Sequence, residues 1–154
     1  MKRIMTILLL MTLALSGFAQ SANLNIRQFM SNNQQRKTEG TKELYVSGKK
    51  LAPYHLTFYH SFTLTDKSRY QALAKQMENA VKADAKTATD RETMDLSGHL
   101  YYAIITLPVD KKTGLNRYIF YKDTTLKGSG KEVIVVYMEG TASIEEIKRD
   151  FKLK

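Results

Sequence analysis

The sequence predicts an α+β fold: one antiparallel sheet of about five strands with helices packed on it, in a single domain. The clearest evidence is the run Leu56–Leu64, in which apolar and polar side chains alternate, followed directly by a helical pattern. Three strand-like runs joined by short loops come later, at 99–107, 117–122 and 132–138. Because short loops join antiparallel neighbours, these runs predict a meander.

The first nineteen residues are typical of a secretory signal peptide. Lys2 and Arg3 form a basic head, Ile4–Leu15 is apolar apart from two threonines, and Ala19 is a small residue at the expected cut. Twelve residues span about 18 Å as a helix, which is short of a bilayer core of about 30 Å. We therefore expect cleavage after export through the Sec pathway to the periplasm, with extracellular release as the alternative. We expect no transmembrane helix in the mature chain.

Composition limits the classes of protein to consider. The chain has no cysteine, which excludes disulfides, thiol catalysis and thiolate metal sites, so apolar burial must stabilise the exported domain. The net charge of +9 falls to +7 once Lys2 and Arg3 are removed. Charges of both signs are spread along the chain, as on an ordinary soluble surface; the alternative is attraction to an anionic envelope glycan or lipid headgroup. Export disfavours nucleic acid as a partner.

We divide the chain into a signal peptide (1–19), an N-terminal segment (20–42) and an α+β domain (43–154). In the N-terminal segment, Ile26, Phe29 and Met30 follow helical spacing, and the polar residues after them predict an exposed linker. The α+β domain opens with a short strand candidate at 43–47, followed by a turn.

Two more helices are expected. The long helix begins after a cap at Thr65 or Asp66 and ends near Ala85, and residues 87–98 then predict a loop. Near the C-terminus, Ser143 and Glu146 match a capping box. The apolar stripe of this short final helix consists of Ile144, Ile147 and Phe151.

The strands of the meander are apolar on both faces, whereas a sheet with one wet face would alternate. The strand 132–138 is the clearest case. In the strand 99–107, strict alternation places Tyr101 with Ala103 and Leu100 with Tyr102. The second face must be covered, either by the chain's own helices or by a partner or ligand. For the latter case, the candidate interaction surface consists of Tyr101, Tyr118, Tyr121 and Tyr137, because tyrosine combines a large apolar ring with a hydroxyl.

The chain shows no pattern that predicts catalytic, metal-binding or cofactor-binding residues. His55 and His60 are five apart, which places them on opposite faces of one strand, and His60 fits a hydrogen-bonded core position. His99 is the first residue of a predicted strand, and no spacing in the sequence places a carboxylate near it. The run Gly128–Lys131 lacks the spacing and the following helix of a phosphate loop.

The C-terminal half carries a resemblance to a known family. The segments are Leu100–Ala103, Asn116–Tyr121 and Lys131–Lys148. They resemble a family of small exported Bacteroidota proteins catalogued as a domain of unknown function. The resemblance implies an exported protein of a Gram-negative envelope, and it implies no activity and no functional residues.

Taken together, these observations predict an exported, non-enzymatic binding or interaction module. Its partner would be a protein or an envelope component, with a homo-oligomer as one form of such an interaction. The alternatives are a small envelope-directed hydrolase, which would need a cleft with converging histidine and carboxylate groups, and a ligand carrier with a pocket between helix and sheet.

Overall fold

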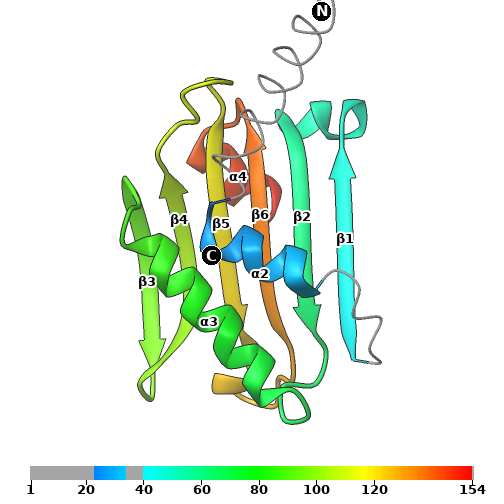
Figure 1. Cartoon of the computed structure of the whole chain (residues 1–154), viewed down its shortest axis with the longest axis vertical. Helices are drawn as coiled ribbons and strands as arrows, with labels where there is room; N and C mark the ends of the chain where they lie inside the picture. The colour runs from blue at the N-terminus through cyan, green and yellow to red at the C-terminus, as the bar shows by residue number, and fades with distance from the viewer. Residues whose placement is uncertain (1–22, 34–39, 154) are drawn as a thin grey trace, which may run out of the picture.

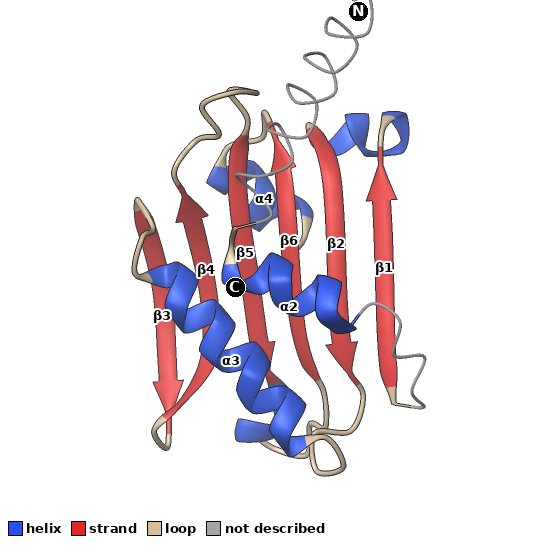
Figure 2. Ribbon diagram, viewed as in Figure 1, coloured by secondary structure: helices blue, strands red, loops and turns tan. Residues whose placement is uncertain are grey.

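Figure 1 shows a computed structural model of the chain, in which residues 23–33 and 40–153 are described. One antiparallel sheet forms the middle layer; α2 and α3 lie across one face and α4 lies behind it (Figure 2). The expected signal peptide (1–19) and residues 34–39 of the expected linker lie outside the described residues. Within the described part, no helix has the length and apolar character needed to cross a bilayer.

The predicted α+β class is confirmed, with six strands rather than about five. The strands are β1 (Thr41–Ser47), β2 (Leu56–Leu64), β3 (Asp90–Leu96), β4 (His99–Leu107), β5 (Asn116–Asp123) and β6 (Val133–Gly140), in the spatial order β1-β2-β6-β5-β4-β3. The α-helices are α2 (Asn25–Asn33), α3 (Gln71–Ala85) and α4 (Ile144–Asp150), and the 3₁₀ helices are η1 (Lys49–Tyr54) and η2 (Thr124–Leu126). The last strand, β6, is inserted between β2 and β5.

The extra strand is β3, where the sequence predicted a loop over 87–98. It is an edge strand with exposed side chains along nearly its whole length, so it lacks the alternation that marks a half-buried strand. It joins β4 through the two-residue turn Ser97–Gly98, and both turn residues have positive φ, 53° and 78°. This combination is typical of a tight hairpin.

The start of the long helix also differs from the prediction. Asp66 does not cap it; its Oδ1 accepts hydrogen bonds from the amide and hydroxyl of Ser68, forming a separate turn. The helix α3 begins five residues later, at Gln71. At α4, in contrast, the predicted capping box between Ser143 and Glu146 is present in both directions.

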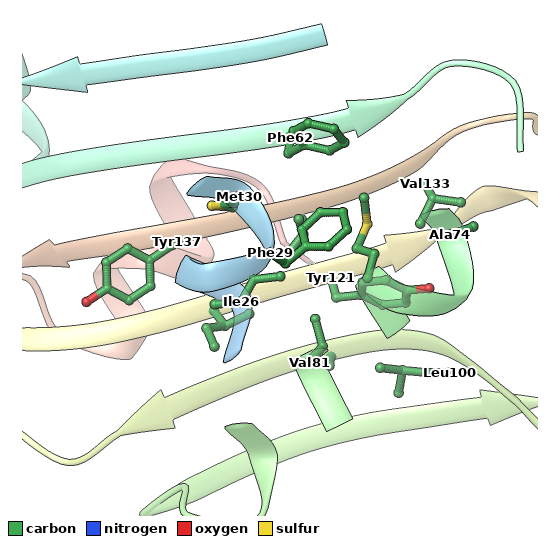
Figure 3. Close-up of a cluster of buried hydrophobic side chains, with 14 of the residues drawn as sticks. Ile26, Phe29, Met30, Phe62, Ala74, Val81, Leu100, Tyr121, Val133 and Tyr137 are labelled. Atoms are coloured by element: carbon green, nitrogen blue, oxygen red, sulfur yellow. The ribbon is translucent and has the colours of Figure 1, made fainter. Parts of the chain in front are cut away.

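The larger core lies between the sheet and the two helices α2 and α3. Ile26, Phe29 and Met30 of α2 are buried against it, as the helical spacing predicted (Figure 3). Asp84 of α3 accepts hydrogen bonds from the backbone amides of Asn25 and Ile26, at 2.8 Å each. The helix α2 is therefore part of the same packed body as the sheet.

The second face of the sheet is covered largely by the chain itself. Leu51 of η1, Ile147 of α4 and Phe151 after α4 pack on it with Tyr102, Phe120 and other residues of the sheet. The strand β4 contains a bulge at Tyr101, which changes the face on which the preceding side chain lies. Asp95 pairs with Leu100 and Met94 pairs with Tyr102, so Tyr101 has no opposite residue. The alternation predicted for Leu100 and Tyr101 is therefore wrong. Leu100 joins Ala103 in the first core, and Tyr101 borders the second.

Candidate functional site

The four tyrosines of the predicted interaction surface do not form one surface. Tyr121 and Tyr137 lie in the core beneath α2 and α3 (Figure 3). Tyr118 lies in the core on the other face, and each of the three rings is at most 3% exposed. Only Tyr101 is partly exposed. Two of the buried hydroxyls donate hydrogen bonds within the chain, Tyr118 to the carbonyl of Ala142 and Tyr137 to the carboxylate of Glu139. The predicted interaction surface of Tyr101, Tyr118, Tyr121 and Tyr137 is therefore wrong, because three of the four rings are buried.

Polar side chains instead converge on a cleft along α3. Two adjoining hollows of about 450 and 470 Å³ share Lys67 and Gln71. We call them together the α3 cleft; its principal polar residues are Lys67, Gln71, Glu78, Lys82, His99 and Asp123. Its lining comes from α3 and the segment before it, from the β3–β4 turn and the start of β4, from the end of β5, and from the connection between β5 and β6.

Glu78 is the buried carboxylate in the middle of the cleft. It accepts hydrogen bonds from the backbone amide of Leu100 at 2.8 Å and from Lys82 Nζ at 2.6 Å, and it lies 3.3 Å from His99 Nδ1. Burial raises the pKa of Glu78, but the hydrogen bonds from Lys82, Leu100 and His99 outweigh it and leave the pKa below its usual value. Glu78 is therefore ionised at neutral pH.

Asp123 is a second buried carboxylate, at the end of β5. Its Oδ2 lies 2.6 Å from Lys67 Nζ, and its Oδ1 accepts hydrogen bonds from the amide and hydroxyl of Thr125. Burial, together with the charges of Asp123 and Glu78, raises the pKa of the neighbouring Tyr121 hydroxyl. Tyr121 therefore stays neutral, and the cleft holds two carboxylate–ammonium pairs around a neutral phenol.

The structure brings Glu78 to His99, a contact that the sequence did not predict. The two residues are 21 positions apart, on α3 and at the start of β4. The His99 side chain is 57% exposed and lines the cleft. No local spacing could have indicated this pair, because it arises from the way α3 crosses the sheet.

The other two histidines have structural partners. His60 is buried and lies 3.0 Å from Arg27 Nη1 and 2.5 Å from Glu43 Oε1, which confirms the predicted hydrogen-bonded core histidine. His55 precedes β2 with φ of 52° and contacts Glu146, so it does not share a strand with His60 as predicted. No group of three or more His, Asp or Glu side chains is placed to hold a metal ion in the described part of the chain.

A smaller, apolar pocket of about 180 Å³ lies on the second face of the sheet, between the strands and the residues that follow α4. Phe120, Ile134 and Val136 form its floor, and Phe151 and Leu153 border it. Tyr59 stacks on Phe151 with ring centroids 5.7 Å apart. The pocket is therefore roofed by the chain's own C-terminal residues.

A sequence model of one protein family matches residues 12–151; it is described as a family of unknown function, DUF6108. The chain belongs to DUF6108. The predicted resemblance to a family of unknown function is thereby confirmed. Searches of curated proteins and of solved structures found no match. Membership in DUF6108 brings no activity and no site residues, so a functional proposal must be argued from the geometry.

Proposed function

We propose that the protein is an exported binding module and that the α3 cleft is its ligand site. Export is the proposal's first part, and it is supported by the basic, apolar and small-residue order of residues 1–19. The second part is supported by one observation: two buried carboxylates, Glu78 and Asp123, each in contact with a lysine ammonium, line an open cleft, whereas such groups are ordinarily found at fully solvated surfaces.

The proposed ligand is a hydroxyl-rich envelope component, such as a saccharide. Glu78 is paired with Lys82 and Asp123 with Lys67, so the buried charges of the cleft are balanced. Around these pairs, the exposed side chains of Gln71 and other polar residues offer donors and acceptors to a neutral, polar ligand. Each hydroxyl of a saccharide both donates and accepts, which matches such a lining.

Binding is favoured over catalysis by the state of the carboxylates. A general acid must hold a proton at the working pH, whereas the lowered pKa of Glu78 keeps it ionised. Asp123 accepts hydrogen bonds from Thr125 and contacts Lys67. The hydrogen bonds and lysine contacts of Glu78 and Asp123 thus connect the elements that line the cleft.

The ligand proposal can be tested by NMR titration of the ¹⁵N-labelled protein with N-acetylglucosamine oligomers and with peptidoglycan fragments. We expect shifts of the amides of Gln71, His99 and Gly130, and weaker binding by at least fivefold in Gln71→Ala. The matched control is Gln76→Ala, because Gln76 is also exposed on α3 but borders a different hollow, beside α2. Shifts confined to other regions, or equal effects of the two variants, would count against this site.

The export proposal has a separate test. The chain expressed with its own first nineteen residues in a Gram-negative host should be recovered from the periplasmic fraction, with Gln20 as its N-terminal residue. Recovery of the uncut chain in the cytoplasm would contradict export and leave the ligand proposal unaffected.

The contact between Glu78 and His99 favours one alternative, a small hydrolase in which His99 acts as the base and Glu78 orients it. Chromogenic acyl esters and glycosides are suitable substrates for a first screen. Turnover that disappears in His99→Ala, with the stability unchanged, would replace the binding proposal with this one.

A further inference from the structure

The two edges of the sheet differ in how they are protected. An edge strand leaves backbone N–H and C=O groups open to another chain, and charges and bulges are the usual protection. The strand β3 has both: Asp90, Arg91, Glu92 and Asp95 are charged, and its pairing with β4 contains a bulge. The strand β1 has two charged residues and no proline, and it pairs with β2 in an unbroken register over seven residues.

The strand β1 also exposes apolar side chains. Leu44 is 53% exposed and Tyr45 is 54% exposed, and they are adjacent. Tyr45 points to the first face, where its ring packs edge-on against Phe58 with centroids 4.9 Å apart. Leu44 therefore points to the second face, on the same side as Val46, which borders the second core. An additional strand beside β1 would cover apolar groups on both faces.

We propose that β1 is the contact of a homodimer, in which β1 of a second copy pairs antiparallel with it about Leu44. Leu44 is the central residue of the seven in β1, so this register pairs the whole strand with no overhang. The two-fold axis is then perpendicular to the sheet, and the first faces of the two copies become continuous. The dimer has a single sheet of twelve strands.

The side chains of β1 favour a second copy in this register. Residues opposite one another share a face, so Leu44 meets Leu44, Glu43 meets Tyr45 and Lys42 meets Val46. No like charges are opposed. A shift of two residues in either direction would leave fewer residues paired, and one of the two shifts would also place Glu43 opposite Glu43, which is unfavourable. The strand is thus self-complementary about Leu44.

The absence of native cysteine makes a direct test possible, because a single introduced cysteine has no other thiol to react with. Directly opposite Cα atoms in an antiparallel pair are about 4.5–5.5 Å apart, within the range that a disulfide spans. In the proposed dimer, Leu44→Cys places two thiols opposite each other on the two-fold axis. We therefore expect rapid formation of a covalent dimer under mild oxidation.

The matched control is Lys42→Cys, on the same strand and the same face. Residue 42 lies opposite residue 46 of the second copy, so the two introduced thiols are four residues apart along the strands, beyond reach. We expect Leu44→Cys to cross-link at least ten times faster than Lys42→Cys. Met94→Cys, on the opposite edge, should be as slow as Lys42→Cys. Equal rates for the three variants would overturn the proposal.

Sedimentation velocity tests the same contact without cross-linking. A pairing of one strand buries less area than stable dimers do, so we expect a reversible dimer that is populated at about 0.1 mM. Leu44→Lys should remove it through like charges on the axis, and mixing Leu44→Lys with Leu44→Glu should restore it. A wild-type protein that stays monomeric at about 0.5 mM, or a dimer unaffected by Leu44→Lys, would overturn the proposal. Circular dichroism of each variant verifies the fold.

Discussion

Arg27 of α2 donates a hydrogen bond from Nη1 to Nδ1 of His60 on β2, with 3.0 Å between the two nitrogens. Because arginine has no acceptor, Nδ1 must accept, and the ring hydrogen lies on Nε2, which donates to Glu43 at 2.5 Å. The guanidinium also lies over the rings of Phe58 and Tyr137, 4.6 and 5.0 Å from their centroids. A neutral imidazole therefore connects α2 to the edge strand β1.

Stability should fall as His60 becomes protonated in the unfolded chain. Burial lowers the pKa of His60, and the charge of Arg27 lowers it further, against the raising effect of the hydrogen bond to Glu43. The unfolded state then binds more protons than the folded state once the pH falls below about 6.5, so the free energy of unfolding decreases on acidification. The stabilisation is fully present above that pH.

Urea denaturation between pH 8 and pH 5 measures this contribution when the wild type is compared with His60→Gln. The wild type should lose more stability than the variant between pH 7 and pH 5. Parallel losses would show that His60 is not the group responsible.

Asp84→Ala should destabilise the packing of α2. Its carboxylate accepts hydrogen bonds from the amides of Asn25 and Ile26 and from the side chain of Asn25, and it is 2% exposed. Removing a charged acceptor that satisfies helix N-terminal amides costs about 2–4 kcal/mol. Chemical denaturation gives the loss, and proteolysis within α2 should become faster. Asp95→Ala, at an exposed position on β3, is the control and should change little.

Tyr118→Phe should cost about 1 kcal/mol, because it leaves the buried carbonyl of Ala142 without the hydroxyl that lies 2.7 Å from it. Asn116 Nδ2 also donates to this carbonyl, which limits the loss. The comparison variant is Tyr54→Phe, at a ring that is 43% exposed, and we expect it to be near neutral. Equal stability of the two variants in thermal denaturation would mean that the Tyr118 hydrogen bond contributes nothing.

Phe120→Ala should cost about 3 kcal/mol, at the lower end for a buried phenylalanine. The ring is 8% exposed and packs edge-on against Tyr102, but it also borders the apolar pocket, so part of its surroundings is already open. Guanidinium denaturation measures the change. A loss below about 1 kcal/mol would contradict the packing of β5 on the second face.

Elements with a clear local pattern were predicted correctly. The strand β6 was predicted to be apolar on both faces, and its side chains do divide between the two cores, for example Val135 in the first and Val136 in the second. The capping box of α4 could also be predicted from the sequence, because its two partners, Ser143 and Glu146, lie within four residues of each other. In each case the residues that form the structural feature are close together in the sequence, so a local pattern can reveal it.

Elements determined by tertiary structure were missed. The bulge at Tyr101 depends on the partner strand β3, and β3 itself shows no apolar face because it lies at an edge. The tyrosines were assigned to an interaction surface because tyrosine combines a large apolar ring with a hydroxyl. The structure supplies internal acceptors instead, such as the carbonyl of Ala142 for Tyr118.

The α3 cleft could not have been predicted from spacing. Glu78 and His99 come from a helix and from a strand start, and Asp123 from the end of the next strand. These three residues lie close together only because α3 crosses the sheet above the strands that carry the other two. The sequence placed His99 at the start of a strand and could not indicate that Glu78 would lie beside it.

The position of β6 has a consequence for how the chain assembles. The β1–β2 unit pairs with the remaining sheet only through β6, which is the last strand to be synthesised. Until Val133–Gly140 is available, the early hairpin and the β3–β4–β5 meander share no ladder of hydrogen bonds, and pairing β2 with β6 must close a long loop. A nascent chain truncated before residue 133 would therefore expose two further open strand edges, those of β2 and β5 that pair with β6, and folding should be completed only after translation has passed this strand.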